Sequence, residues 1–217
     1  MKKIILIASV AAILISTGCE SNPLYFRLAS LYFPVSPSGT TWEYSIDGGG
    51  SRIVTVVDQV VMGERPCWRL QSGADYEYYI NDNGKLEKFE NQTILFNGFE
   101  VPIYQGWLTL FQWPLTDGIS SRDSVGAQTV SQGVTLSHTW VRTQTVTGPV
   151  VSPDGEWAEC YKIHREETTI NWIQTAGFNP ETTVTVTSIW LAPDVGMVAL
   201  ESDEHVLTLT SFTPGGN

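Results

Sequence analysis

From Thr40 onward, apolar and polar residues alternate in short runs that are separated by turn residues. The run Thr41 to Ile46 places Trp42, Tyr44 and Ile46 on one side of an extended chain, and residues 47–50 follow as an Asp-Gly-Gly-Gly turn. Side chains of a β-strand point alternately to two faces, so this pattern predicts a strand with one buried face. The pattern continues almost to the end of the chain and predicts an all-β domain.

Further strands are predicted by runs rich in Val, Ile, Thr and aromatic residues. They cover 51–62, 67–70, 75–80, 85–89, 134–146, 156–172, 182–191, 197–202 and 205–212, with shorter aromatic-rich runs at 94–99, 101–104 and 107–113. Asn83-Gly84 is a strong hairpin signal, whereas residues 117–123 have the composition of a loop. About ten strands joined by hairpin-length turns predict an antiparallel meander, and its long strands should bend. We expect a strongly curved sheet or open barrel, with a two-sheet β-sandwich as the alternative.

Composition supports one folded domain and narrows the partners. Hydrophobic residues make up 42% of the 217 residues and charged residues only 16%, which is the opposite of the composition of disordered chains. The formal charge of -11, without any cluster of Lys and Arg, argues against binding to nucleic acid and against electrostatic docking on anionic lipid.

The first residues have the pattern of an export signal. Lys2 and Lys3 precede an apolar run from Ile4 to Ile15, and the small residues Ser16, Thr17 and Gly18 follow. As a helix this run would span only about 18 Å, which is too short for a bilayer. We therefore predict that residues 1–18 are a signal peptide.

The stretch Ser16-Thr17-Gly18-Cys19 resembles the lipobox of bacterial lipoproteins, although Ser16 stands where that family usually has Leu. The resemblance implies cleavage before Cys19, acyl chains such as palmitate on its sulfur, and a lipid-anchored protein outside the cytoplasm. Glu20, directly after the lipid-bearing cysteine, favours anchoring in the outer membrane if the cell has two membranes. Residues 19–39 would form a tether, with a short helix over Leu24, Leu28 and Leu31, and residues 40–217 the single β domain. The alternative is a plain secretory signal with Cys19 left free.

Two motifs near the ends of the domain resemble a group of poorly characterised all-β bacterial envelope proteins. The first is Tyr-Phe-Pro at 32–34 followed by Gly-Thr-Thr-Trp-Glu-Tyr at 39–44, and the second is Trp-Leu-Ala-Pro-Asp-Val-Gly-Met-Val at 190–198. The resemblance implies an envelope domain and transfers no activity. In architecture alone, the expected sheet is also similar to the curved-sheet carriers that move lipoproteins between membranes.

Cys67 and Cys160 are the two cysteines of the predicted β domain. Outside the cytosol they would form one disulfide, or they would stay as two separate buried thiols. Neither lies in a Cys-x-x-Cys motif.

Motifs for chemistry are absent from the sequence. His138, His164 and His205 lie in predicted strands without metal-ligand spacing, and neither a metalloprotease motif nor a Gly-x-Ser-x-Gly motif occurs. We therefore expect no metal site, no cofactor and no catalytic set.

Aromatic residues concentrate between residues 76 and 113. Tyr76 and Tyr78 share one face of their strand, and Trp107, Phe111 and Trp113 would share a face in a regular strand. These five side chains would fill the core of a curved sheet, or they would line a cleft for an apolar ligand or stack on sugar rings. The leading hypothesis is a non-enzymatic binding or scaffolding lipoprotein of the cell envelope. The alternatives are a carrier of a lipid-like ligand, a carbohydrate-binding module and, as the least favoured, a hydrolase.

Overall fold

The structure is a computed structural model that describes residues 32–216, except residues 36, 83 and 176. The predicted signal peptide, Cys19 and the helix predicted in the tether lie outside these residues. The described chain forms the strands β1 (Thr41–Ile46), β2 (Ser51–Met62), β3 (Arg65–Ser72), β4 (Asp75–Asp82), β5 (Lys85–Phe96), β6 (Phe99–Gln112), β7 (Ser120–Ser131), β8 (Val134–Val150), β9 (Cys160–Gln174), β10 (Glu181–Ala192), β11 (Gly196–Ser202) and β12 (Val206–Thr213). No helix in this part of the chain is long and apolar enough to cross a membrane.

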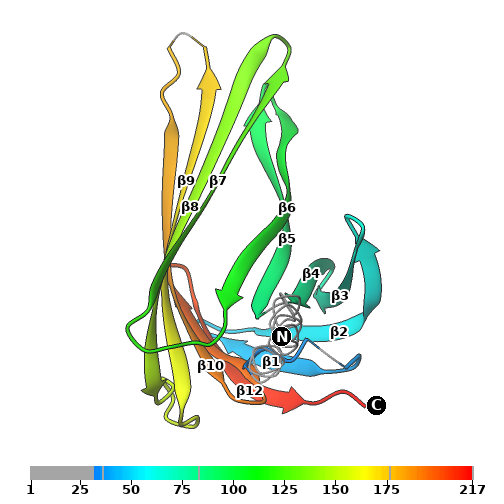
Figure 1. Cartoon of the computed structure of the whole chain (residues 1–217), viewed down its shortest axis with the longest axis vertical. Coiled ribbons are helices and arrows are strands. Elements are labelled where there is room, and N and C mark those ends of the chain that lie inside the picture. Colours follow the sequence, from blue (N-terminus) through cyan, green and yellow to red (C-terminus); the bar gives the residue numbers. More distant parts are fainter. Residues whose placement is uncertain (1–31, 36, 83, 176, 217) are drawn as a thin grey trace, which may run out of the picture.

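All these strands belong to one antiparallel sheet that curls into a nearly closed barrel (Figure 1). Their order is β6-β5-β4-β3-β2-β1-β12-β11-β10-β9-β8-β7, so each strand pairs with its neighbours in sequence and β1 also pairs with β12. The predicted all-β class and long-stranded, strongly curved meander are confirmed, and the two-sheet sandwich is not the fold. Strands β6 and β7 are the two edges of the sheet. Between them the barrel has an unsealed seam.

Side chains bridge this seam at two levels. At the ends of two hairpins, the amide of Asn97 donates a hydrogen bond to Oε1 of Gln132, over 3.1 Å. Nearer the base, the carbonyl oxygen of Leu110 on β6 accepts hydrogen bonds from Gln144 on β8 and Arg165 on β9. The two edges are therefore held together by side chains and not by a backbone ladder.

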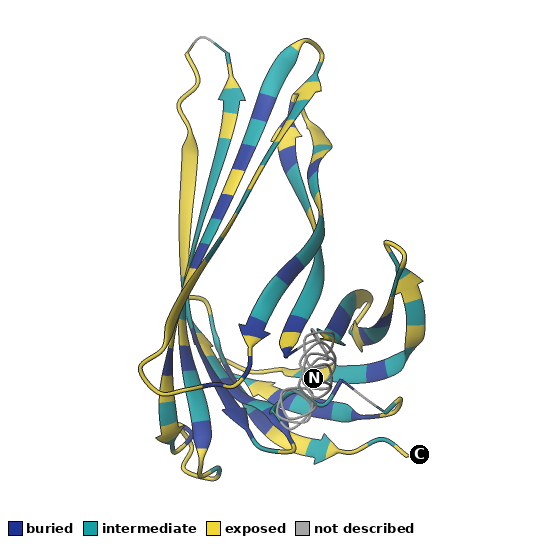
Figure 2. Cartoon of the chain, viewed as in Figure 1, coloured by how far each residue is buried: buried dark blue, intermediate teal, exposed yellow. Residues whose placement is uncertain are grey.

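The buried residues form two clusters inside the barrel (Figure 2). The larger cluster fills the end where the shorter strands β1, β11 and β12 meet the others. The smaller one packs Ile94, Phe96 and Ile103 of the β5–β6 hairpin against Leu136 of β8, across the seam. Between the clusters, the lumen is lined by polar side chains as well as apolar ones.

The segment before β1 closes the base of the barrel. Phe33 packs between the rings of Tyr79 and Phe111, with centroid distances of 5.6 and 6.4 Å, and Val35 is buried beside it. Tyr32 stacks on Trp113 at 5.7 Å. The chain entering the domain is therefore part of its core.

The two motifs noted at the ends of the sequence contact one another directly. The indole N–H of Trp42 donates to the carbonyl of Val195 over 2.6 Å, and the hydroxyl of Tyr44 donates to the carbonyl of Met197 over 3.0 Å. Gly196 between them has a φ of +95°, which favours glycine, and a Cβ there would lie 3.2 Å from Cδ of Pro34. Both motifs therefore have a structural role.

Three predicted boundaries were wrong. Residues 120–131 form β7, although no strand was predicted there, because this edge strand offers few apolar side chains as a signal. The short runs at 94–99, 101–104 and 107–113 are one long hairpin of β5 and β6. Strand β9 begins at Cys160, since residues 151–159 form a turn rather than the start of a strand.

Candidate functional site

A cavity of about 290 Å³ lies in the lumen of the barrel, above the larger core cluster. Its wall is formed by side chains from β1 to β6 and from β9 to β11, together with Phe33. The floor is apolar and includes Trp42, Val54, Leu191 and Met197. Six charged side chains also line it: Arg52, Glu77, Lys88, Glu90, Arg165 and Glu167. The cavity therefore combines an apolar floor with a charged upper wall.

One side of the charged wall is an ion-pair cluster on β4 and β5. Nζ of Lys88 lies 3.1 Å from Glu77 and 3.0 Å from Glu90, and the hydroxyl of Tyr79 donates to Glu77 over 2.7 Å. Burial alone would raise the pKa of Glu77, but the charge of Lys88 and the tyrosine hydrogen bond lower it below its ordinary value. Burial also opposes the charge on Lys88, yet its two carboxylate neighbours raise its pKa. The cluster therefore stays ionised and its charges are paired internally.

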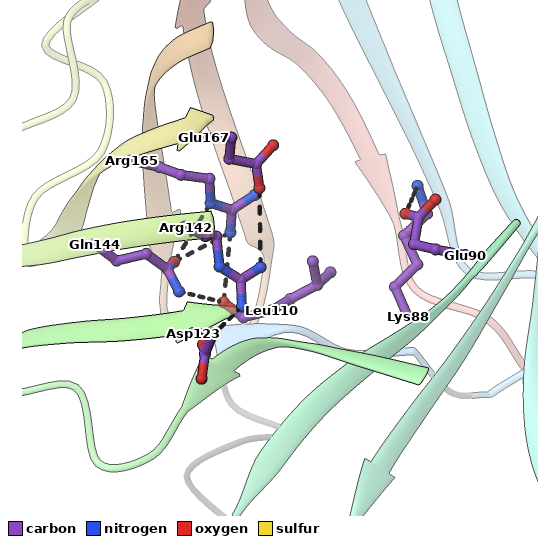
Figure 3. A network of polar contacts seen from close by, with 8 residues as sticks. All are labelled: Lys88, Glu90, Leu110, Asp123, Arg142, Gln144, Arg165 and Glu167. Atoms are coloured by element: carbon purple, nitrogen blue, oxygen red, sulfur yellow. Dashed lines mark hydrogen bonds and ion pairs between the residues drawn. The ribbon is translucent and has the colours of Figure 1, made fainter. Parts of the chain in front are cut away.

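The facing side of the wall, on β9, is built around Arg165, which contacts Gln144 of the neighbouring strand β8 (Figure 3). Its guanidinium donates to Oε1 of Gln144 over 3.2 Å and to the carbonyl of Leu110 over 3.4 Å, and it lies 5.3 Å from the ring centroid of Phe111. Burial and the nearby charge of Arg142 lower the pKa of Arg165 to about 10, so it still carries its charge at neutral pH. Among the described residues, no carboxylate lies within ion-pair distance of Arg165.

The second arginine of this side, Arg142 on β8, is buried and paired. Its Nη2 lies 3.1 Å from Asp123 on β7, its Nη1 lies 4.0 Å from Glu167, and the guanidinium stacks 4.9 Å from the ring centroid of Trp140. Figure 3 shows Arg142, Asp123 and Glu167 with Arg165 on one side of the lumen, and Lys88 with Glu90 on the other. Arg165 thus differs from Arg142, because its hydrogen bonds in the described chain go to neutral acceptors.

The five predicted ligand-face residues do not share one face. Tyr76 and Tyr78 alternate with Glu77 and Tyr79, which line the lumen, so they point outward. Tyr76 is 46% exposed, and its ring centroid lies 4.9 Å from the guanidinium carbon of Arg69. One face of this ring is therefore occupied, which leaves less of it for stacking on a sugar.

The three predicted residues on β6 are divided between the two faces by a β-bulge. Trp107 is opposite Phe89 and packs edge-on against it outside the barrel, whereas Phe111 is opposite Leu86 and lies inside. The register shifts between these pairs because Leu110 is an extra residue on β6. Trp113, beyond the strand, is buried in the core. The prediction that Trp107, Phe111 and Trp113 share a face assumed a regular strand and was wrong.

The two cysteines of the domain are separate buried thiols. Cys67 is on β3 and Cys160 on β9, and each sulfur donates to a nearby carbonyl, of Val60 and Trp157 respectively, over 3.5 Å. Burial raises the pKa of both thiols, that of Cys160 to about 11. The structure therefore has the second of the two alternatives left by the sequence.

Comparison with known proteins adds no family. No family model matches the chain, and no curated protein or solved structure matches it.

Among the described residues, no group of three His, Cys, Asp or Glu side chains is placed to hold a metal ion. His138 is buried and hydrogen-bonded to Asn171 over 2.8 Å. The function has to be argued from the lumen itself.

Sequence reasoning missed the charged wall of the lumen. Arg142, Arg165 and Glu167 lie on strands in which both faces carry polar residues, so alternation did not separate the inward side chains from the outward ones. The inward direction of these residues follows from the pairing of β8 with β9, where Arg142 is opposite Glu167 and Gln144 is opposite Arg165.

Proposed function

We propose that this chain is a lipid-anchored protein of the bacterial cell envelope whose β domain binds an apolar ligand with an anionic head group, without catalysing a reaction. The observation that carries the proposal is the lumenal cavity, which joins an apolar floor to an arginine without a carboxylate partner among the described residues. Ligand sites are typically concave, largely apolar and oriented by a few polar groups.

The apolar part of the ligand would lie on the floor formed by Phe33, Trp42, Leu191 and their neighbours. The cavity volume of about 290 Å³ is close to the lower end of the usual range for ligand pockets. This favours a single slender chain, such as one acyl chain, over a lipid with several chains.

The anionic head would bind Arg165. A guanidinium offers several N–H donors in one plane and matches the geometry of carboxylate and phosphate. The neutral acceptors that now hold Arg165, Gln144 and the carbonyl of Leu110, fix its direction without cancelling its charge. Lys88 would contribute less, since Glu77 and Glu90 already neutralise it.

The binding experiment titrates the exported protein with cis-parinaric acid, a fluorescent fatty acid. Replacing Arg165 by Gln should weaken binding roughly tenfold to a hundredfold, because a hydrogen bond to a charged group is worth about 1.5–3 kcal/mol. Arg69→Gln on the outer face is the matched control and should leave binding unchanged. The affinity of the unsubstituted protein should also fall as the pH rises through about 10, where Arg165 loses its charge.

Native mass spectrometry of the exported protein provides the second readout. Added mass that disappears in Arg165→Gln would give the class of the natural ligand. If neither method detects binding, or if both arginine variants bind equally well, the lumen is not an anionic-ligand site and a scaffolding role takes its place.

The lipid anchor is a separate part of the proposal and rests on residues 1–19 of the sequence. Cys19→Ala should accumulate as an unprocessed precursor without acyl chains, because the sulfur that would receive the diacylglyceryl group is gone. A normal mature mass for this variant would exclude the anchor and leave the ligand proposal untouched.

A further inference from the structure

The three long hairpins β5–β6, β7–β8 and β9–β10 project together at one end of the molecule (Figure 1). The side-chain hydrogen bond from Asn97 to Gln132 joins the ends of the first two. Thr135 near the start of β8 is opposite Gln174 at the end of β9, which brings the third hairpin beside the second. We call these hairpin ends, residues 91–105, 124–141, 168–175 and 177–184, the distal tips, with bounds that follow the pairing of the strands.

The distal tips expose large apolar side chains. The exposed fractions are 69% for Leu95, 69% for Phe99, 68% for Val130, 42% for Trp172 and 58% for Phe178. Water-exposed side chains of this size are ordinary when scattered singly, but a group of them at one end of a molecule marks an interaction surface. On their inner side the tips are tied together by the smaller apolar cluster around Ile94 and Leu136.

The distal tips contain no Lys or Arg, and their carboxylates are Glu100, opposite Leu95, and Glu181, opposite Asn171, in a chain with 35 charged residues. The turns at the opposite end of the same strands are acidic: Asp117 precedes β7, Asp154, Glu156 and Glu159 precede β9, and Asp194 precedes β11. Moving an ionised side chain out of water is costly. The end with apolar side chains is thus also the end with fewer charged residues, and its two carboxylates would stay in the hydrated head-group layer.

We propose that the distal tips insert into the interfacial region of a lipid bilayer. A fluid surface accepts three separate protruding hairpins, whereas a protein partner would need a matching shape for each. Trp172 has the amphipathic ring that is common at membrane interfaces, and Asn97 and Gln132 can hydrogen-bond with head groups. Because the tips have no cationic side chain and the protein is acidic, neutral or zwitterionic lipid is the expected partner.

The tips are remote from the point where the N-terminal segment enters the domain. Tyr32 lies at the other end, against Trp113 and Tyr161. Docking by the tips is therefore independent of any anchor at Cys19. It places a second membrane contact on the domain itself, in the bilayer that holds an anchor or in an apposed one.

The experiment attaches a polarity-sensitive fluorophore to single introduced cysteines of the full exported chain. Val130→Cys reports on a distal tip, and Val61→Cys is the matched control, because Val61 is as exposed but lies at the turn between β2 and β3. The buried thiols should not react in the folded protein, and the unsubstituted chain labelled in parallel corrects for Cys19. The quencher is phosphatidylcholine with brominated acyl chains, supplied either in the vesicles that carry the protein or in vesicles added to them.

Quenching of the Val130 label in at least one arrangement, with the Val61 label unaffected, is the expected result. Phe99→Asp in the same background should weaken it about tenfold, because it removes the burial of a phenylalanine and adds a charge. Ile53→Asp on β2 should have no effect. Equal quenching at both labels, or none in either arrangement, overturns the proposal. So does a lipid-independent blue shift that grows with protein concentration, which would make the tips an interface between copies of the chain.

Discussion

Arg142 offers a direct test of how the buried charges contribute to stability. Its side chain is completely buried, and Nε and Nη1 have no hydrogen-bond partner among the described residues. Each unsatisfied donor costs about 1–3 kcal/mol. Against this, the hydrogen bond to Asp123 contributes about 1.5–3 kcal/mol and the stacking on Trp140 about 0.5–2 kcal/mol. The opposing contributions are of equal size, so the charge itself should add almost nothing to the free energy of unfolding.

Replacing Arg142 by Met keeps most of its volume and removes the charge and the unsatisfied donors. The freed carboxylates can hydrate, because the side chains of Asp123 and Glu167 are 45% and 31% exposed. We expect the free energy of unfolding to stay unchanged or to rise by up to about 2 kcal/mol, as when other buried ion pairs are replaced by apolar residues. Arg142→Ala, which also removes the volume, should lower it by about 2–5 kcal/mol.

Equilibrium unfolding in urea, with the slope of the transition compared between variants, measures both changes. Asp123→Asn supplies the opposite perturbation and should destabilise the protein by about 1–2 kcal/mol, since it leaves the buried cation with only Glu167 at 4.0 Å. The reasoning is refuted if Arg142→Met costs as much as Arg142→Ala. In that case the ion pair, and not the packing, would stabilise this region.

Three further outcomes follow from the lumen and the strands around it. Lys88 holds the pKa of Glu77 below its ordinary value, so ionised Glu77 stabilises the fold above its unfolded pKa of about 4.3. This contribution is lost as the pH falls through the folded pKa. Glu77→Gln should therefore flatten the acid side of a plot of stability against pH. Gly148→Ala should destabilise by about 1–3 kcal/mol in a thermal melt, since the added Cβ would lie 2.9 Å from the carbonyl oxygen of Cys160; an unchanged melting temperature would show that the strand can move aside. Neither Cys67 nor Cys160 should react with a thiol reagent at pH 7 until the protein unfolds, because burial raises both pKa values; rapid labelling of the folded protein would contradict this.

The sequence predicted the fold class well because its strongest signals are local. Trp42, Tyr44 and Ile46 alternate on a strand as expected, and β2, β10 and β12 follow runs of β-branched residues. Asn97-Gly98 is also a hairpin signal, and both residues adopt the positive φ values that such a turn requires. Polar residues 91–93 interrupt the apolar pattern before it, so alternation predicts several short runs where the structure has one hairpin.

The site was less predictable, because it depends on features that arise from pairing between strands. The bulge at Leu110 reverses the faces of Trp107 and Phe111 and turns a backbone carbonyl toward Arg165, and no residue type in β6 marks its position. The inward orientation of Arg165 depends on register as well. Alternation predicts which residues share a face of a strand, but it does not say which face is inside when both are polar.

The position of the seam has a consequence for how the chain can be rearranged. Thr41 and Thr213 are paired across β1 and β12, so the two ends of the sheet's sequence are adjacent, whereas residues 113–119 link its two free edges. A circular permutant that joins the ends and opens the chain within 113–119 would keep every strand pair. Every strand would then pair only with its neighbours in sequence, because β1 with β12 is the pair whose strands are far apart in the natural order. Lower contact order speeds folding, and such a permutant should refold faster than the natural order of strands.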